Sequence, residues 1–289
     1  MTVALNTNVV GRIVSTKTAI VTGASSGIGE ATALRLNSLG YTVYAAARRI
    51  DKMAPLAAAG IRTVKLDVTD DASLIAFVDQ VVAESGPVDV LVNNAGYGSY
   101  GALEDVPLDE ARRQFEVNLF ALARLTQLVL PHMRSQRSGY IFNVSSIGGK
   151  IYEPMGGWYH STKFAVEGLS DSLRIELAPF GIHVVLIEPG AIATEWSGIA
   201  SRNMLATSGA GAYAQIATGV AKVLDMTDKR ASKPEVVANA IVKALHSQHP
   251  RTRYAMGLGA KPMTYARRVL PDKVFDRLVR MGMGIPKSL

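Results

Sequence analysis

The chain has no cysteine in its 289 residues, which excludes disulfide bonds, thiolate metal sites and cysteine nucleophiles. It also lacks a basic N-terminal segment followed by an apolar stretch, and no run of about 18 uncharged apolar residues occurs in it. We therefore expect a cytoplasmic protein without a transmembrane segment.

Two further kinds of site have no support in the sequence. The five histidines show no metal-ligand spacing with carboxylates, so we expect no metal site. We expect no nucleophile elbow of a hydrolase either. A content of 48% hydrophobic and 19% charged residues suits a globular enzyme with a sizeable core.

The net charge of +7 comes from one end of the chain. Nine basic residues and two acids lie between Pro250 and Leu289, so the first 249 residues are balanced. This distribution argues against a nucleic-acid ligand. The tail can instead form a solvated helix face, steer anionic ligands, contact another subunit or make a peripheral membrane contact.

Short apolar runs alternate with helical patterns along most of the chain. Strands are expected at 18–22, 41–46, 63–66, 88–92, 140–144, 183–187 and 253–256, and helices at 27–39, 52–59, 70–85, 104–134, 158–179, 234–246 and 271–281. Strands without polar alternation, separated by helices, indicate an α/β fold with a parallel sheet covered on both faces. Because no linker interrupts the pattern, residues 17–289 are expected to form one domain behind a loose lead-in at 1–16.

Two segments near the C-terminal end depart from this alternation. Residues 191–230 are rich in Ala, Gly, Ser and Thr, which predicts a mobile flap over a site. Residues 258–289 are expected to form a basic amphipathic segment.

A glycine-rich turn, TGASSGIG at 22–29, joins the first predicted strand to its helix. Glycines let the backbone approach phosphates, and a helix N-terminus offers unpaired N–H groups and the positive end of its dipole. The turn therefore predicts a dinucleotide site, although such glycines can also serve local packing alone. The residues expected at the pyrophosphate are Gly23, Ser25, Ser26, Gly27, Ile28 and Gly29.

This turn is the first of six features that occur between residues 22 and 194. It is followed by Asn93-Asn94-Ala95-Gly96, Asn118, Ser145-Ser146, Tyr159-x-x-x-Lys163 and Pro189-Gly190. In these features the chain resembles the short-chain dehydrogenase/reductase family. The resemblance implies a single doubly wound Rossmann domain of about seven parallel strands, a nicotinamide cofactor, and a homodimer or homotetramer.

The end of the second predicted strand bears on the choice of nicotinamide cofactor. An NAD site usually has Asp or Glu about 20 residues after the glycines, where it accepts from the ribose 2′-hydroxyl. Here Arg48 and Arg49 follow the strand, and no acid occurs before Asp51. Guanidinium donors suit a 2′-phosphate, so we expect NADP(H) rather than NAD(H), with Arg48 as first choice and Arg49 as second. The alternative is that both are surface arginines at a helix entry.

The resemblance also implies further cofactor contacts. It places Asp67 and Val68 against the adenine, although Asp67 can equally be a turn or capping residue. The other implied contacts are Asn94, Ala95 and Gly96 beneath the adenosine ribose, Pro189, Gly190, Ile192 and Thr194 at the carboxamide, and Tyr159 and Lys163 beside the nicotinamide ribose.

Tyr159 and Lys163 lie four residues apart in a predicted helix, so both side chains project from one face. A free phenol titrates near pH ~10, and an adjacent ammonium favours the phenolate. We therefore expect Lys163 to lower the pKa of Tyr159, and Tyr159 to act as the acid/base that interconverts a carbonyl and an alcohol.

Two more polar side chains complete the expected centre. A hydroxyl should polarise the substrate oxygen, and the family places its serine thirteen positions before the tyrosine, which favours Ser146 over Ser145. The resemblance gives Asn118 a part in a proton relay with Lys163, and a side chain that is satisfied locally is the alternative.

Apolar and aromatic residues flank these groups, which favours a lipophilic ketone, aldehyde or secondary alcohol of steroid, retinoid-like or acyl type. The residues expected to line the substrate pocket are Ser146, Ile147, Tyr152, Trp158, Tyr159 and Trp196. They can also be ordinary core, and the basic tail can select an anionic substrate instead. An epimerase or dehydratase and a non-catalytic cofactor-binding scaffold are the alternative functions.

Overall fold

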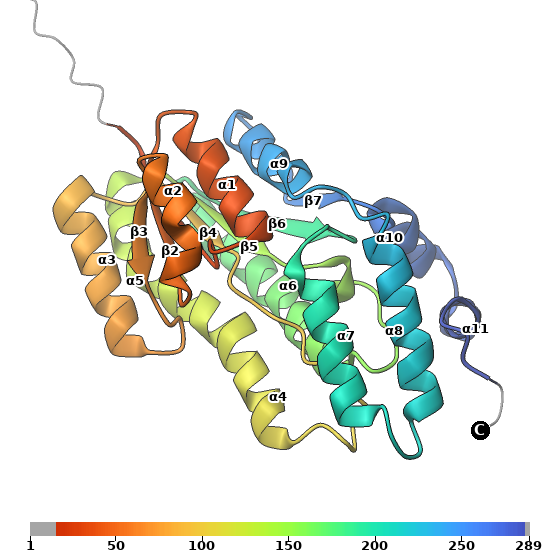
Figure 1. Cartoon of the computed structure of the whole chain (residues 1–289). Helices are drawn as coiled ribbons and strands as arrows, with labels where there is room; N and C mark the ends of the chain where they lie inside the picture. Colours follow the sequence, from red (N-terminus) through yellow and green to blue (C-terminus); the bar gives the residue numbers. More distant parts are fainter. Residues whose placement is uncertain (1–15, 287–289) are drawn as a thin grey trace, which may run out of the picture.

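Seven parallel strands form one sheet in the computed structural model, which describes residues 16–286 (Figure 1). The strands are β1 (Thr18–Thr22), β2 (Thr42–Ala47), β3 (Arg62–Lys65), β4 (Val90–Asn93), β5 (Gly139–Val144), β6 (Ile182–Pro189) and β7 (Arg253–Met256). Their order in the sheet is β3-β2-β1-β4-β5-β6-β7. The predicted α/β Rossmann fold is confirmed.

The central strands are apolar along their whole length because both faces of the sheet are covered. Every residue of β1 and β4 is buried. Ala19 of β1 pairs with Val43 on one side and with Val90 on the other, so β1 lies between β2 and β4. A parallel strand in this position has no solvent-facing side, which explains why it lacks polar alternation.

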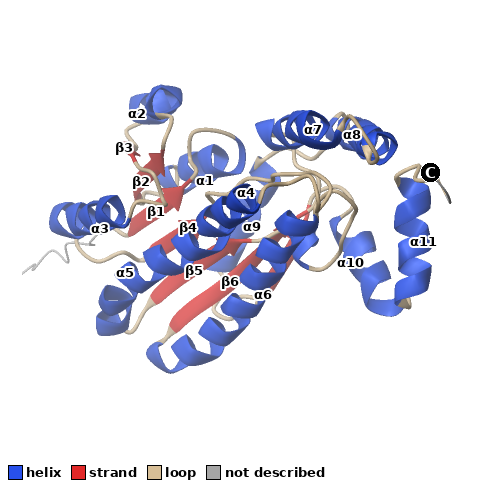
Figure 2. Ribbon diagram, turned by 90° about the horizontal axis from the view of Figure 1, so that it is seen from below, coloured by secondary structure: helices blue, strands red, loops and turns tan. Residues whose placement is uncertain are grey.

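Helices cover the two faces in separate groups. The long or sheet-covering helices are α1 (Gly27–Asn37), α2 (Ala54–Ala58), α3 (Asp71–Ser85), α4 (Leu108–Phe115), α5 (Ala121–Gln136), α6 (Gly157–Leu177) and α9 (Glu235–Leu245). Side chains of α1, α2 and α9 pack on one face, and those of α3, α5 and α6 pack on the other. Figure 2 shows α5 and α6 on one face of the sheet, running along the strands. Short helical turns occur at η1 (Ile50–Met53), η3 (Ile147–Gly149) and η4 (Ala178–Phe180).

The chain changes direction in the sheet between β1 and β4. It runs outward from β1 to β3 and then returns to place β4 beside β1. In parallel sheets a crevice opens at the carboxyl ends of the strands at such a switch point. The glycine turn after β1 and the Asn94 segment after β4 meet there.

The segment 191–230, which was predicted to be a mobile flap over a site, is helical. It forms two helices, α7 (Glu195–Ser208) and α8 (Ala214–Asp228), that pack against each other beside the sheet (Figure 1). Ala200, Met204, Ala217 and Val220 are fully buried between them. Their small and apolar side chains recur at helical spacing, but the Gly, Ser and Thr residues among them obscured the pattern.

Two other predictions need correction. The single helix expected at 104–134 begins only at Leu108 and is divided by a π-helical turn, η2 (Glu116–Phe120). An unpredicted helix, α10 (Ala260–Val269), precedes α11 (Asp272–Gly282). The lead-in predicted at 1–16 lies outside the described residues apart from Thr16. Among residues 16–286, no helix combines the length and apolar character needed to cross a membrane.

Candidate active site

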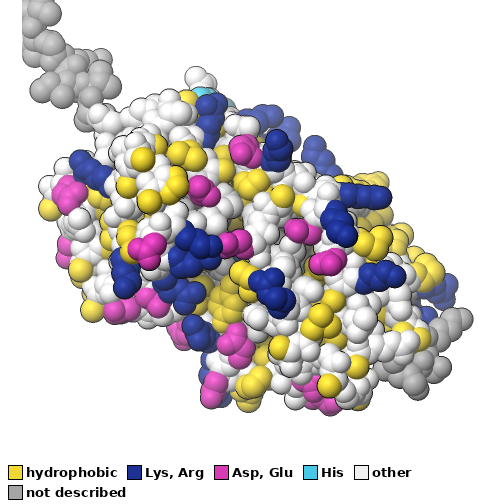
Figure 3. Space-filling view, in the orientation of Figure 1, with side chains coloured by type: hydrophobic (Ala, Val, Ile, Leu, Met, Phe, Trp, Pro, Cys, Tyr) yellow, Lys and Arg dark blue, Asp and Glu magenta, His cyan; other side chains and the backbone are white. Residues whose placement is uncertain are grey.

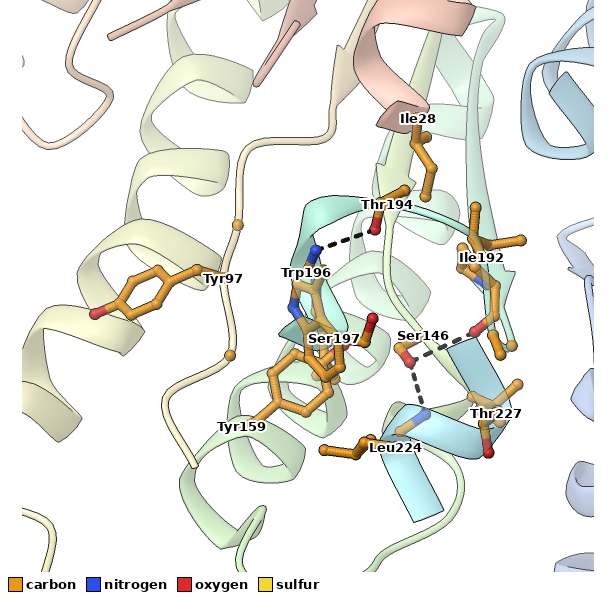
Figure 4. A pocket seen from close by; sticks show the side chains of 18 of the residues that line it. Ile28, Tyr97, Ser146, Tyr159, Ile192, Thr194, Trp196, Ser197, Leu224 and Thr227 are labelled. Atoms are coloured by element: carbon orange, nitrogen blue, oxygen red, sulfur yellow. Dashed lines mark hydrogen bonds between the residues drawn. The ribbon is translucent and has the colours of Figure 1, made fainter. Parts of the chain in front are cut away.

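A cavity of about 590 Å³ opens at the carboxyl ends of β1, β4, β5 and β6. Its walls include the glycine turn on one side and α7, α8 and the start of α10 on the other. Figure 4 shows Ser146 and Tyr159 within it, with Trp196 of α7 beside the phenol and Leu224 and Thr227 of α8 facing Ser146. Residues that are more than two hundred positions apart in the sequence thus share one site.

Close packing requires glycine at two positions of the turn 22–29. Gly23 has φ +64, and a Cβ at Gly29 would lie 2.4 Å from the carbonyl oxygen of Gly23. A side chain at Gly29 would also lie 2.6 Å from Nδ2 of Asn94. The turn therefore stays tight and leaves its backbone exposed to the cavity.

Asn94 and Thr22 brace this turn against the next strand. Nδ2 of Asn94 donates to the carbonyl oxygens of Thr22, at 2.9 Å, and Gly23, at 3.3 Å. The hydroxyl of Thr22 accepts from the backbone N–H of Asn94 and of Ala95, each at 3.0 Å. The side chain of Asn94 is thus used for positioning the turn.

The cavity suits a dinucleotide at its β1 side. Ser26 precedes α1 without a side-chain capping bond, so the first N–H groups of the helix stay open toward a ligand. Of the predicted cofactor residues, those that line the cavity are Gly23, Ser26, Gly27, Ile28, Arg49, Asn94, Gly96, Tyr159, Lys163, Pro189, Gly190, Ile192 and Thr194. Those outside the lining set are Ser25, Gly29, Arg48, Asp67, Val68 and Ala95.

The structure reverses the order in which the two arginines approach the cavity. Arg49 lines it, and its guanidinium donates to the hydroxyls of Ser25, at 3.2 Å, and Ser26, at 3.0 Å. The same side chain pairs with Glu195 at 2.8 Å, and Lys52 pairs with that carboxylate at 2.6 Å. Arg49 therefore connects the glycine turn to the first residue of α7.

Arg48 lies outside the cavity wall, and its charge acts on Asp67. Burial raises the pKa of Asp67, but hydrogen bonds from Thr69 and the charge of Arg48 outweigh it and lower the pKa overall. The carboxylate of Asp67 accepts from both the N–H and the hydroxyl of Thr69. This is the turn role that the sequence left open for Asp67.

Ser146, Tyr159 and Lys163 share one wall of the cavity. Nζ of Lys163 lies 5.9 Å from the centre of the Tyr159 ring and donates to the carbonyl oxygen of Val144 at 2.9 Å. The hydroxyl of Ser146 accepts from the N–H of Gly148 at 3.0 Å and lies close enough to the phenol of Tyr159 to lower its pKa. No such bond exists for Ser145, whose hydroxyl is buried without a partner in the described part of the chain.

The pKa of Tyr159 lies above its ordinary value in this structure, not below it. Burial raises the pKa of Tyr159 to about 12, with Ser146 lowering it and the charge of Glu153 raising it. Burial also lowers the pKa of Lys163 to about 8, although the charge of Glu167 raises it. Desolvation is the largest cause of both shifts because the two side chains are almost fully enclosed.

The side chain of Asn118 does not reach Lys163. Its Oδ1 accepts from the N–H of Tyr97 at 3.0 Å, and its Nδ2 donates to the carbonyl oxygen of Tyr97 at 2.9 Å and to the hydroxyl of Thr162 at 3.0 Å. The hydrogen bonds of this side chain are therefore made locally, which was the alternative to a part in the proton relay. Its backbone lies in the π-helical turn η2, a feature that recurs at functional sites.

Two of the predicted substrate residues lie outside the cavity wall. Trp158 packs edge-on against Phe115 of α4, with ring centres 6.5 Å apart. Tyr152 contacts the C-terminal helices, where its hydroxyl donates to Asp276 at 2.8 Å. Ile147 and Trp196 do line the cavity. Which face of a short loop or helix turns inward is set by packing that the sequence does not reveal.

Several cavity residues were missed. Tyr100 is buried with its ring centre 5.7 Å from that of Tyr159, and its hydroxyl donates to Glu153 at 2.8 Å. His160 lies beside them, with Nδ1 2.9 Å from the carbonyl oxygen of Gly148. Other missed wall residues lie on α8 and in the C-terminal segment around α10 and α11, and include Leu224, Leu258, Met263 and Met283. No sequence motif marks any of them. Among residues 16–286 there is no cluster of three side chains that could bind a metal ion.

The family model of short chain dehydrogenases matches residues 17–204, which include the glycine turn and the Ser146, Tyr159 and Lys163 group. The chain belongs to the short-chain dehydrogenase/reductase family. It is therefore an oxidoreductase that acts on CH–OH and C=O groups with an NAD(P) cofactor.

Relatives are similar over nearly their whole length. A probable short-chain type dehydrogenase/reductase VdlC of Helicobacter pylori is 36% identical over 91% of this chain and 96% of the relative. A 3-ketodihydrosphingosine reductase of Bacteroides thetaiotaomicron is 35% identical over 92% of this chain and 97% of the relative. An NADPH-dependent 3-dehydrocapnine reductase of Ornithobacterium rhinotracheale is 34% identical over 90% of this chain and 95% of the relative. The crystal structure of a short-chain dehydrogenase from Streptomyces avermitilis matches with TM-score 0.78 and 35% identity over 92% of this chain and 96% of that one.

Proposed function

We propose that this short-chain dehydrogenase/reductase is an NADP(H)-dependent carbonyl reductase or alcohol dehydrogenase for a lipophilic substrate, with Tyr159 as its acid/base. The observation that carries the proposal is the shared cavity wall of Ser146, Tyr159 and Lys163, which faces the glycine turn across one space. The glycine turn would hold the pyrophosphate of a nicotinamide cofactor, which would supply or accept the hydride of the reaction.

The side chains divide the remaining chemistry among them. Tyr159 donates a proton to the carbonyl oxygen in reduction, and its raised pKa of about 12 keeps the phenol protonated for that step. Ser146 donates a hydrogen bond to the same oxygen as negative charge develops on it. Lys163 would hold the nicotinamide ribose. A relay past Asn118 would have to use its backbone, since its side chain is already bonded.

Preference for NADP(H) is supported by the lack of an acid between Ala47 and Asp51 and by two exposed arginines there. A relative that is 34% identical is named NADPH-dependent. Arg49→Ala and Arg48→Ala, made singly, test which guanidinium meets the 2′-phosphate. We expect Arg49→Ala to weaken NADPH binding more than NADH binding. Equal losses for the two cofactors in both variants would contradict the preference.

A lipophilic, uncharged or cationic substrate is supported by the charges around the cavity. The acids Glu153 and Asp228 line it, and no Lys or Arg of the described tail 250–286 does so. The tail residues that face the cavity are Leu258, Gly259, Met263 and Met283. The basic tail therefore has no described group in position to select an anionic substrate.

The test of the reaction is the loss of NADPH absorbance with a panel of hydrophobic ketones and aldehydes, run beside Tyr159→Phe. Turnover by the wild type and its loss in the variant are expected. An epimerase or dehydratase would convert substrate without net NADPH consumption, and a scaffold would show no turnover at all, so either result would contradict the proposal.

A homodimer or homotetramer remains part of the proposal. Phe120, Phe164 and Ile175 are large apolar residues that stand exposed on η2 and α6. Light scattering of the wild type beside Ile175→Glu tests whether this face joins subunits. A monomeric mass for the wild type would contradict the oligomer.

A further inference from the structure

The C-terminal helices α10 and α11 expose apolar and basic side chains together. Figure 3 shows hydrophobic and basic groups side by side at the edge of the molecule that these helices form. The apolar members are 39–68% exposed. We call the following set the tail surface: Tyr265, Val269, Val274, Leu278 and Met281, with Lys261, Arg268, Lys273 and Arg277.

The tail surface is not the side by which these helices pack on the protein, because other residues of each helix form its packed side. Phe275 and Val279 of α11 pack against Ile151, and Phe275 is fully enclosed. The ring centre of Tyr152 lies 5.3 Å from that of Phe275, and the hydroxyl of Tyr152 donates a hydrogen bond to Asp276. Both helices are thus attached to the body through one face while the tail surface points away from it.

The exposed apolar residues follow helical spacing. Val274, Leu278 and Met281 stand at i, i+4 and i+7, and therefore form one stripe along α11. Lys273 and Arg277 border this stripe on one side. On α10, Tyr265 and Val269 are four residues apart and have Lys261 and Arg268 beside them. An apolar stripe bordered by cations occurs on both helices.

The cations of the tail surface are not neutralised by the tail's own acids. Asp272 pairs with Arg267 at 2.9 Å, and Asp276 accepts from Tyr152. Within residues 16–286, no carboxylate lies within 4.0 Å of Lys261, Arg268, Lys273 or Arg277. The surface therefore presents a net positive field over an apolar stripe.

We propose that the tail surface docks on an anionic lipid bilayer. Apolar side chains of an amphipathic helix enter the boundary between headgroups and acyl chains, while flanking Lys and Arg meet the anionic headgroups. A second copy of the chain would bring cations against cations in a symmetric contact, which disfavours self-association here. A nucleic acid would leave the apolar stripe without a partner.

The same helices also form part of the cavity wall. Met263 of α10, Leu258 just before it and Met283 just after α11 line the cavity. Docking would therefore place one wall of the active site next to the lipid phase, where a lipophilic substrate is concentrated. This consequence rests on the proposed function, whereas the docking itself does not.

Vesicle flotation tests the docking without any activity measurement. The full chain is mixed with phosphatidylcholine vesicles that contain either no phosphatidylglycerol or a third of it, at low and high salt. We expect binding to the anionic vesicles only, weakened by salt. Lys273→Gln with Arg277→Gln should lower the partition by about 25-fold, since each surface cation contributes about fivefold. Arg35→Gln with Lys65→Gln removes equal charge elsewhere and should change little.

Leu278→Glu tests the apolar stripe. Ile75→Glu on α3 is its matched control, because these side chains are 39% and 37% exposed and α3 lies at the opposite end of the molecule (Figure 1). Loss of flotation in Leu278→Glu alone supports the proposal. Equal binding to neutral and anionic vesicles, or a smaller solution mass of Leu278→Glu with unchanged flotation, would overturn it. Turnover of a short, water-soluble ketone should stay unchanged in all these variants, which separates failure of docking from failure of the proposed reaction.

Discussion

Residues 17–190 and 191–286 contribute to one cavity in different ways. The first region holds β1 to β6, and the polar groups proposed for chemistry, Ser146, Tyr159 and Lys163, follow its strands or lie on α6. The second region supplies apolar walls such as Trp196, Leu224 and Met263. Chemistry is thus placed on a sheet buried on both faces, and the substrate enclosure is placed on helices at its edge.

The two regions also differ in how they are held. The sheet core consists of two clusters, one on each face, that join many strands and helices. The core between α7 and α8 is a smaller and separate cluster, which reaches the first region mainly through Tyr100, Ala102, Met155 and Tyr159. We expect the α7–α8 pair to open independently of the sheet, as elements with few contacts often do.

Leu91→Ala and Met204→Ala test whether the α7–α8 pair opens independently of the sheet. Both residues are fully buried, one in β4 and one in α7, and each truncation should cost about 2–5 kcal/mol of local packing. We expect Leu91→Ala to lower the global free energy of unfolding in urea by that amount. Met204→Ala should instead speed hydrogen exchange mainly in α7 and α8. Equal losses of global stability would show that the two regions unfold as one.

Ser146→Ala and Trp196→Ala separate chemistry from enclosure. Removal of one donor to a developing oxyanion costs about 10²–10³ in kcat, so Ser146→Ala should lower kcat with little change in KM. Trp196, whose ring centre lies 5.1 Å from that of Tyr159, should affect KM for bulky ketones more than kcat. Steady-state kinetics with NADPH measures both. A larger kcat effect for Trp196→Ala would assign it to the chemistry.

Lys163→Met should trade activity for stability. Burial lowers the Lys163 pKa from 10.5 to about 8, which corresponds to a cost of up to about 3 kcal/mol for keeping it charged in the folded state. The variant should therefore be inactive but more stable than the wild type at pH 7. This gain is full below pH 8, where the lysine is charged in both states, and vanishes as the pH rises through 10.5. Urea unfolding at pH 7 and pH 10.5 checks it, and a gain that grows with pH would contradict the assignment.

Glu195→Gln should have the smallest effect. The carboxylate of Glu195 holds Arg49 and Lys52, and all three side chains are more than 40% exposed, so the pairs are weak. Release of Arg49 should tighten NADPH binding by about two- to fivefold and leave NADH binding unchanged. Fluorescence titration measures both, with Glu235→Gln at the start of α9 as the matched control. Unchanged NADPH binding would mean that Arg49 does not meet the 2′-phosphate.

Much of the first region was predictable because its local signals agree with its packing. The apolar runs at 18–22 and 140–144 can be buried along their whole length as parallel strands, and the structure confirms a strand at both places. In the second region, α7 and α8 were harder to predict because neither has a long apolar stripe. α7 and α8 mix Gly, Ser and Thr with a few apolar residues, and only mutual packing makes them helical.

The sequence by itself determined the alternation of strands and helices from β1 to β6, the glycine turn and the spacing of Tyr159 and Lys163, since all of these depend on residues near one another in the chain. Tertiary structure decided that Trp158 turns toward Phe115, that Arg49 rather than Arg48 lines the cavity, and that Met263 and Met283 close it. It also decided the pKa of Tyr159, because that pKa is raised mainly by burial, which depends on every element packed around the phenol.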